Sequence, residues 1–177
     1  MKLIIDSGST KTDWIAIDES GSILLETHTL GLNPQVLTEA IIEERIINNY
    51  DLYRIRNEVD SIYFYGAGCG TEPPRKLMGD VLKSIFQNAS ISVKEDTFAA
   101  VYAITNPGDP SIVCILGTGS NCSFFDGESV HQKITSLGYI LMDDASGNYF
   151  GRQLLRDYYF NKIPKPLAKS FAEEFNL

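Results

Sequence analysis

The chain has 177 residues, of which 44% are hydrophobic, and this suffices to bury a core in one or two small domains. Its formal net charge of -8 and its scattered Lys and Arg residues exclude the clustered basic surface of a nucleic-acid-binding protein. No apolar stretch reaches the length of a signal-peptide core or a membrane-spanning helix, so we expect a cytoplasmic protein without a membrane partner.

The first part of the chain alternates between short apolar runs and turns rich in Gly and Ser. Three such runs, at residues 3–6, 14–18 and 23–29, predict a meander of antiparallel strands. Apolar residues then recur at helical spacing from Pro34 to Ile47, which predicts a helix with the proline near its first turn.

The alternation continues with two strand–helix pairs. Residues 61–65 and 91–94 predict strands. An amphipathic helix through residues 77–85 follows the first, and a helix that begins at Asp96 follows the second. The order βββαβαβα predicts a mixed sheet with crossover helices, an α/β fold.

The segment at residues 106–110 is the richest in Pro and Gly and predicts a boundary between domains at residues 1–110 and 111–177. Beyond it the pattern of the first domain begins again with a second meander. Its three runs span residues 112–116, 122–125 and 130–135. A helix and a last amphipathic stretch follow, so the second part repeats the strand–turn–strand opening of the first.

Two turns, at residues 6–12 and 117–121, combine glycine with hydroxyl side chains. Glycine lets the backbone approach a ligand closely, and hydroxyls and amides suit a phosphate. We expect the following residues to hold phosphate: Gly8, Ser9, Thr10, Lys11, Thr12, Gly117, Thr118, Gly119 and Ser120. One such turn is weak evidence, because most Gly/Ser turns only reverse the chain. Two in a duplicated layout can clamp one polyphosphate from both sides.

Asp6 stands at the end of the first apolar run. A carboxylate there can hold a hydrated Mg²⁺ ion, which prefers few carboxylates and several waters. An aspartate that only caps the turn is the alternative.

Two other phosphate motifs do not fit the sequence. Thr10 stands where a Walker loop needs glycine. The glycines of residues 66–71 suggest a dinucleotide fingerprint, but the third is misplaced, and we expect Pro73 and Pro74 to delay the following helix. A tight turn that lines a cleft is the better interpretation of this stretch.

The histidines and cysteines favour structural interpretations. His28 and His131 have no carboxylate–histidine pattern beside them in the sequence, and we expect them to be surface or satisfied residues. Cys114 lies in an apolar run and is predicted to be buried. Cys69 has no base that would make it a nucleophile. The spacing of the three cysteines is not that of a metal site and indicates reduced thiols.

The two Gly/Ser/Thr turns resemble the phosphate loops of the sugar-kinase, heat-shock ATPase and actin superfamily. Within it, the chain resembles the N-acetylglucosamine kinases and the related activator ATPases of the BadF/BcrA type. Further stretches that match the family lie at residues 31–34, 65–69, 96–100 and 138–151. The resemblance implies a ribonuclease H-like actin-fold domain at residues 1–110, followed by the beginning of a second, duplicated domain.

The resemblance also implies roles for single residues. Asp96 falls where the family keeps the general base that accepts the proton of the sugar 6-hydroxyl. An aspartate that caps the helix is the structural alternative. ATP would be the phosphoryl donor, with Mg²⁺ held by Asp6. The positions that match sugar-contacting residues are Asn33, Gly68, Asn121 and Asp143.

Two stretches depart from the family pattern. Residues 142–146 read Met-Asp-Asp-Ala-Ser where the family has Gly-Asp-Glu-Gly-Ser, and residues 136–138 read Ser-Leu-Gly where it has Gly-Trp-Gly. These departures put the sugar and the local loop geometry in question.

The implied function is ATP-dependent phosphoryl transfer to an amino sugar, with N-acetylglucosamine the first candidate, in a protein that could form a homodimer. Two alternatives stay open: an ATPase that activates a reductase through an iron–sulfur cluster, and a domain that senses sugar or nucleotide without catalysis. Because members of the family continue further, we expect the second domain to be truncated here and the 177 residues alone to be inactive.

Overall fold

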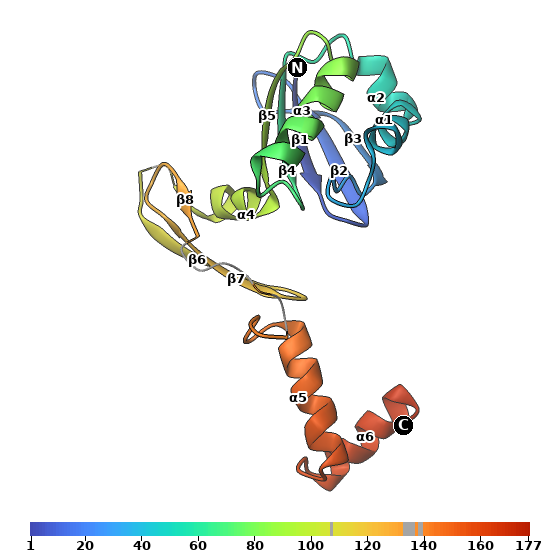
Figure 1. The fold of residues 1–177 in the computed structure, drawn as a ribbon, viewed down its shortest axis with the longest axis vertical. Coiled ribbons are helices and arrows are strands. Elements are labelled where there is room, and N and C mark those ends of the chain that lie inside the picture. The colour runs from blue at the N-terminus through green and yellow to red at the C-terminus, as the bar shows by residue number, and fades with distance from the viewer. Residues whose placement is uncertain (107, 133–136, 138–139) are drawn as a thin grey trace. The chain divides into compact units, whose positions relative to one another are not determined.

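A computed structural model describes residues 1–106, 108–132, 137 and 140–177 (Figure 1). The chain divides into two compact units, Met1–Ile104 and Thr105–Leu177. Each unit has a sheet of its own. The assignment of residues 1–110 and 111–177 to two actin-like domains remains a prediction.

The first unit is built on a five-stranded mixed sheet with the order β3-β2-β1-β4-β5. The three strands of the predicted meander are antiparallel, whereas β4 and β5 run parallel to β1. The strands are β1 (Lys2–Ser7), β2 (Lys11–Ile17), β3 (Ile23–Leu30), β4 (Ser61–Gly66) and β5 (Ser90–Glu95). The predicted mixed α/β sheet is confirmed.

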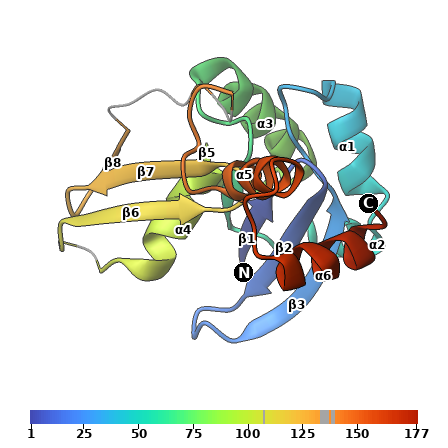
Figure 2. The same cartoon turned by 90° about the horizontal axis from the view of Figure 1, so that it is seen from below.

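Helices cover both faces of this sheet. Figure 2 shows α1 and α3 on one side and α4 on the other. The helices of the first unit are α1 (Glu39–Ile47), α2 (Tyr50–Ile55), α3 (Glu72–Ile85) and α4 (Asp96–Ile104). The helix α3 buries Met78, Val81, Leu82 and Ile85, residues at the spacing that places side chains on one helix face.

The helix boundaries differ from the sequence prediction in three places. The first helix begins at Glu39, later than expected from Pro34. A short helix α2 follows, and Asn49 caps its N-terminus by accepting a hydrogen bond from the Leu52 amide. The expectation that Pro73 and Pro74 delay α3 is wrong, because both lie in its first turn, where the absent N–H groups would have no helical partner.

The core of the first unit lies between the sheet and α1 to α3. Trp14 is 1% exposed, as its place in an apolar strand predicts. Its Nε1 donates to Thr29 Oγ1 at 3.0 Å, so the one polar atom of the indole is satisfied. Its ring centroid lies 6.5 Å from that of Phe86, which precedes β5.

The second unit contains an antiparallel sheet with the order β6-β7-β8. Its elements are β6 (Ser111–Leu116), β7 (Ser120–Phe125), β8 (Val130–His131), α5 (Gly147–Tyr159) and α6 (Lys165–Phe175). The end of the predicted third run, at residues 133–135, lies outside the described residues, as do Ser136 and Gly138. Among the described residues, no helix combines the length and the apolarity needed to cross a bilayer.

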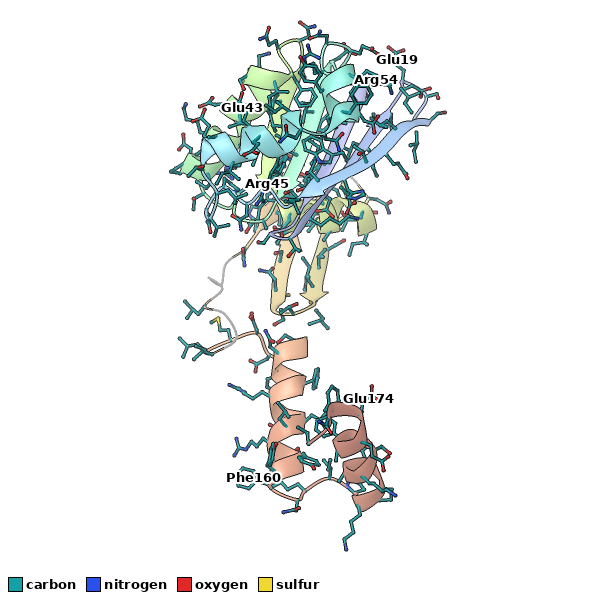
Figure 3. All side chains as sticks on the ribbon, turned by 90° about the vertical axis from the view of Figure 1, so that its right-hand side faces the viewer. Glu19, Glu43, Arg45, Arg54, Phe160 and Glu174 are labelled. Carbon is teal, nitrogen blue, oxygen red and sulfur yellow. The ribbon has the colours of Figure 1, made fainter. Side chains whose placement is uncertain are left out.

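Aromatic contacts join the two helices of this unit. The ring centroids of Tyr158 in α5 and Phe171 in α6 lie 5.2 Å apart, and Phe171 also packs against Phe175 within α6 at 4.9 Å. Phe160 is the C-cap residue directly after α5, and Glu174 lies near the C-terminal end of α6; both are labelled in Figure 3.

Candidate functional site

The turns that carry the predicted residues of the first unit lie at one edge of its sheet. The parallel strands β1, β4 and β5 are in register at Ser7, Gly66 and Glu95, where each strand ends. The segments that follow therefore leave from the same edge, which is where ligands bind in open α/β sheets. This edge is the end of the sheet away from the N-terminus in Figure 1.

Two buried hydroxyl groups stabilise the first phosphate turn at its base, where β1 ends and β2 begins. Ser7 Oγ and Thr12 Oγ1 lie 2.8 Å apart, and Ser7 Oγ also accepts from the Leu32 amide at 3.2 Å. The Gly8 amide donates to the Lys11 carbonyl at 2.9 Å and closes the turn. Ser7 and Thr12 are fully buried, so Thr12, predicted to hold phosphate, braces the turn in this structure.

The remaining predicted phosphate residues of this turn face outward. Gly8 is half-buried, whereas Ser9, Thr10 and Lys11 are exposed. Lys11 Nζ lies 2.5 Å from Asp13 Oδ1 on the same strand. The tip of the turn therefore offers backbone amides, two hydroxyls and one ammonium group to a ligand.

Gly31 packs directly against this turn. A Cβ atom at Gly31 would lie 2.3 Å from the carbonyl carbon of Ser9, so no larger residue fits. The Gly31 amide donates to the Thr10 carbonyl at 2.9 Å. Its carbonyl accepts a hydrogen bond from Arg45 of α1, which is labelled in Figure 3. Sequence analysis missed Arg45, since nothing in the spacing of α1 indicates this contact.

Asn33, predicted to contact the sugar, lies between the turns that follow β1 and β4. Its Nδ2 donates to Ser9 Oγ at 3.0 Å, and its Oδ1 accepts from the Gln35 amide at 2.9 Å. Gly68 lies directly beside the same Oδ1, where a Cβ would come within 2.2 Å. The structure thus brings together Ser9, Asn33 and Gly68, three predicted site residues from three loops.

We predict that Gly68→Ala destabilises the first unit by roughly 1–2 kcal/mol or more and moves Asn33. Gly68 has φ +82°, which costs a residue with a Cβ about 1–2 kcal/mol, and the new methyl group would collide with Asn33 Oδ1. Urea unfolding measures this loss. Gly21→Ala is the matched control, because Gly21 has φ +84° but a Cβ added there would meet no atom within 4 Å. Equal losses in both variants would contradict the collision.

Carboxylates gather at the same edge. Asp6 pairs with Asp13 across β1 and β2, and Asp96 begins α4 directly after β5. Burial raises the pKa of Asp6, and the negative charges of Asp96 and Asp13 raise it further. Asp6 and Asp96 therefore lie close enough to act on each other electrostatically, which suits the binding of a cation.

The carboxylates at this edge are too few to replace all the waters of Mg²⁺, so they fit a hydrated ion. Among the described residues, no group of three or more His, Cys, Asp or Glu side chains is arranged to hold a metal ion. Mg²⁺ keeps several waters and is commonly held by one or two carboxylates together with substrate phosphates. Asp6, whose carboxylate is partly covered but still accessible near the end of β1 beside the phosphate turn, meets that requirement.

Glu95, which directly precedes Asp96, is a further half-buried carboxylate at this edge that sequence analysis did not single out. Burial raises the pKa of Glu95, and the Asp96 charge raises it further. A Cβ at Gly70 would lie 3.1 Å from Glu95 Oε1, so this carboxyl group lies against the turn after β4. Cys69 of the same turn is fully buried, and burial raises its pKa to about 11, in agreement with the prediction that it is no nucleophile.

The second phosphate turn joins β6 to β7 and is fastened to the start of α5. The Gly117 amide donates to the Gly119 carbonyl at 2.9 Å. The first two amides of α5 donate to the turn, Gly147 to the Gly117 carbonyl at 2.8 Å and Asn148 to the Thr118 carbonyl at 3.2 Å. The hairpin with a Gly/Ser/Thr turn predicted from the repeat is therefore present in both units.

Two predicted sugar-binding residues of the second unit line one hollow. Asn121 and Asp143 belong to the described lining of a cavity of about 410 Å³, together with Ser120 of the phosphate turn. A Cβ at Gly119 would lie 2.7 Å from Asp143 Oδ2, so the Asp143 carboxylate lies against the turn. Asn121 Oδ1 accepts a hydrogen bond from Ser123 Oγ at 2.9 Å. This bond does not use the Asn121 amide nitrogen, which can donate to a ligand.

The two glycines that this chain lacks at residues 142–146 have different structural consequences. Ala145 has φ 63°, a left-handed conformation that glycine adopts freely and alanine does not. Met142 is not among the described residues with positive φ, so its side chain imposes no such cost. Asp143, at φ 64°, has the same strained conformation as Ala145.

We predict that Ala145→Gly stabilises the second unit by about 0.5–1 kcal/mol. The left-handed conformation costs alanine about 1–2 kcal/mol, and the greater freedom of glycine in the unfolded chain offsets part of the gain. The midpoint of urea unfolding measures the change. Met142→Gly is the control and should destabilise, because it adds only unfolded-state freedom. A loss of stability in Ala145→Gly would contradict the strain.

One expectation about a single side chain is confirmed and one is corrected. His131 is a satisfied surface residue as expected, since its Nε2 lies 2.6 Å from Asp126 Oδ2 in the turn between β7 and β8. Hydrogen bonds from the Ser129 amide and from His131 hold the pKa of Asp126 well below its usual range. Cys114 is exposed and not buried, because it lies on the outer face of β6.

The arrangement is that of the expected actin-like fold: a hairpin with a Gly/Ser/Thr turn, followed by parallel strands, and a second hairpin with such a turn. No family model matches the sequence. A Porphyromonas gingivalis protein assigned as an N-acetylglucosamine kinase is 35% identical with a TM-score of 0.83, and the match covers 100% of this chain and 62% of that one. The chain thus spans less than two thirds of the length of this relative.

Two further structures share the fold at lower identity. A Chromobacterium violaceum protein assigned as an N-acetylglucosamine kinase has a TM-score of 0.57 at 16% identity, over 97% of this chain and 62% of that one. A transcriptional regulator of the ROK family, a homologue of the E. coli MLC protein, has a TM-score of 0.62 at 14% identity, over 95% and 52%. These two share the fold alone, whereas the Porphyromonas gingivalis relative confirms the predicted resemblance to N-acetylglucosamine kinase-type proteins.

Proposed function

We propose that the chain binds ATP and an amino sugar and serves the transfer of a phosphoryl group to the sugar 6-hydroxyl, with N-acetylglucosamine as the substrate. The observation that carries this proposal is the gathering of Asp6, Asn33 and Asp96 at one edge of the first sheet. Phosphoryl transfer needs a positioned base, a polar sugar contact and charge neutralisation, and these residues offer one of each.

Asp96 is the proposed general base. It is half-buried at the first turn of α4, and its Oδ1 accepts from the Thr97 amide at 2.9 Å, which fixes the carboxylate. The other oxygen is left for a sugar hydroxyl. As that hydroxyl attacks the terminal phosphate, its proton passes to Asp96.

Asp6 is the proposed anchor for the metal. A Mg²⁺ ion with its waters would neutralise charge on the phosphates, as in other enzymes of phosphoryl transfer. The exposed tip of the first turn, with Lys11 and the amides after Gly8, would bind phosphate oxygens.

Each unit carries proposed sugar contacts of its own. In the first, Asn33 is held by Ser9 and the Gln35 amide and lies against Gly68. In the second, Asn121 and Asp143 line the hollow beside Ser120. Amide and carboxylate groups bind hydroxyls well, because amides donate and accept while carboxylates accept strongly.

The test is the formation of a sugar phosphate, measured by mass spectrometry with protein in excess over sugar. Protein in excess makes even a single turnover visible, so the assay does not depend on repeated turnover by this chain, which spans 62% of its relative. N-acetylglucosamine should be phosphorylated before N-acetylmuramic acid, glucosamine or glucose. Binding of sugar and ATP by calorimetry without any sugar phosphate would favour a sensing domain. A brown, oxygen-sensitive protein would favour the reductase activator.

A further inference from the structure

Two of the three cysteines face each other across the hairpin that carries the second phosphate turn. Cys114 of β6 and Cys122 of β7 are paired residues in the antiparallel register. Their Sγ atoms lie 3.4 Å apart, and both residues are exposed. Neither the proposed kinase reaction nor the sequence analysis gives this pair a role.

The backbone separation expected at a directly paired position lies within the range of disulfides. Directly opposite residues of antiparallel strands have Cα atoms roughly 4.5–5.5 Å apart, and disulfides form at about 4.4–6.8 Å. Small rotations of the two side chains would bring the sulfur atoms from 3.4 Å to bonding distance without moving the strands.

The third cysteine supplies an internal comparison. Cys69 is fully buried in the first unit, and burial raises the pKa of its thiol to about 11. A thiol that is neither exposed nor readily ionised reacts slowly with oxidants. The hydrogen bond with Cys114 raises the pKa of the Cys122 thiol as well, so exposure is what should let an oxidant distinguish the pair from Cys69.

We propose that Cys114 and Cys122 are a redox modification site, at which a hydroperoxide converts the two thiols into a reversible disulfide within the hairpin. One thiolate attacks the peroxide oxygen and becomes a sulfenic acid, with release of an alcohol or, from hydrogen peroxide, of water. The second thiol then attacks that sulfur and displaces water. Two thiols and one peroxide thus give one disulfide, the reduced peroxide and one water.

A disulfide at this site would affect the second phosphate turn, because the two cysteines lie beside it. Cys122 directly follows Asn121, and both cysteines line the hollow that also contains Ser120 and Asp143. A disulfide would lock the pairing of β6 with β7 beside the turn. The thiol chemistry itself does not depend on the proposed kinase reaction.

The test counts thiols in the whole chain after treatment with hydrogen peroxide. The protein is oxidised in its folded state, unfolded, alkylated with N-ethylmaleimide and weighed by mass spectrometry. We expect the loss of two of the three alkylation sites and their return after reduction by dithiothreitol. Chymotryptic cleavage after Leu116 separates the two cysteines, so the two peptides should stay joined until reduction.

Single variants complete the design. Cys69→Ser should leave the linked peptides unchanged, whereas Cys114→Ser and Cys122→Ser should each remove them. Three alkylated cysteines after oxidation of the unmodified chain would overturn the proposal. So would a linkage through Cys69, or oxidation of Cys122 to a sulfinic acid without any link to Cys114.

Discussion

Replacement of Asp96 by Asn should slow the phosphorylation of N-acetylglucosamine by roughly 100- to 10,000-fold, the range that a positioned general base contributes. In the unmodified chain the Thr97 amide donates to Asp96 Oδ1 at 2.9 Å. Asn keeps the size of the side chain and an oxygen that can accept this hydrogen bond, so the start of α4 should be preserved. What is lost is the ability to take a proton. The rate is measured in single turnovers, with protein in excess over sugar.

Glu95→Gln is the matched control for Asp96→Asn, since it neutralises the neighbouring carboxylate that lies against Gly70. It should reduce the rate much less. Binding of sugar and nucleotide, measured by calorimetry, should change little in both variants. Equal rates in Asp96→Asn and the unmodified chain would show that Asp96 is a helix cap without a catalytic role.

Replacement of Asp6 by Asn should weaken the Mg²⁺-dependent binding of ATP by about tenfold or more, which corresponds to ~1.4 kcal/mol. The amide lacks the charge that holds a hydrated cation. Calorimetry with and without Mg²⁺ measures the effect. If the affinity for Mg²⁺-ATP is unchanged while the variant is folded, Asp6 is not the metal anchor.

The same substitution should stabilise the free protein at neutral pH. The pKa of Asp6 is raised from 3.8 by burial and by the charges of Asp96 and Asp13, so the folded state favours the protonated form. Its contribution to stability is fully present below pH 3.8 and is lost as the pH rises through the raised pKa. Asp6→Asn removes that penalty, so its advantage should appear above this window and vanish below pH 3.8.

Asp18→Asn is the control, and its effect on stability at neutral pH should have the opposite sign to that of Asp6→Asn. Hydrogen bonds from the Ser20 side chain and the Ser22 amide lower its pKa below 3.8, so its charged form stabilises the turn between β2 and β3. Asp18→Asn should therefore reduce stability at neutral pH and have no effect once the pH falls below the lowered pKa. Thermal unfolding across pH measures both variants, and shifts of the same sign would contradict the assignment.

The sequence predicted the strands, the two Gly/Ser/Thr turns and the start of α4 well, because each has a local signal. Short apolar runs bounded by turn residues mark β1 and β2, and Asp96 directly follows β5. The short helix α2 was missed, since its six residues are too few for a periodic pattern and depend on the Asn49 cap.

Contacts between loops could not be predicted from spacing. The hydrogen bond from Asn33 to Ser9 joins residues that lie far apart along the chain, and the contact of Gly68 with Asn33 depends on the parallel pairing of β1 with β4. Cys114 was predicted as buried because its strand is apolar. In an antiparallel hairpin the two faces differ, and Cys114 lies on the exposed one.

The most direct test of the account is ³¹P NMR of the product formed from ATP and N-acetylglucosamine. We expect a phosphomonoester coupled to the two protons on C6 of the sugar, formed only with Mg²⁺ and strongly reduced in Asp96→Asn. Coupling to the anomeric proton would contradict the proposed acceptor. Release of ADP at the same rate with and without sugar would contradict the kinase itself.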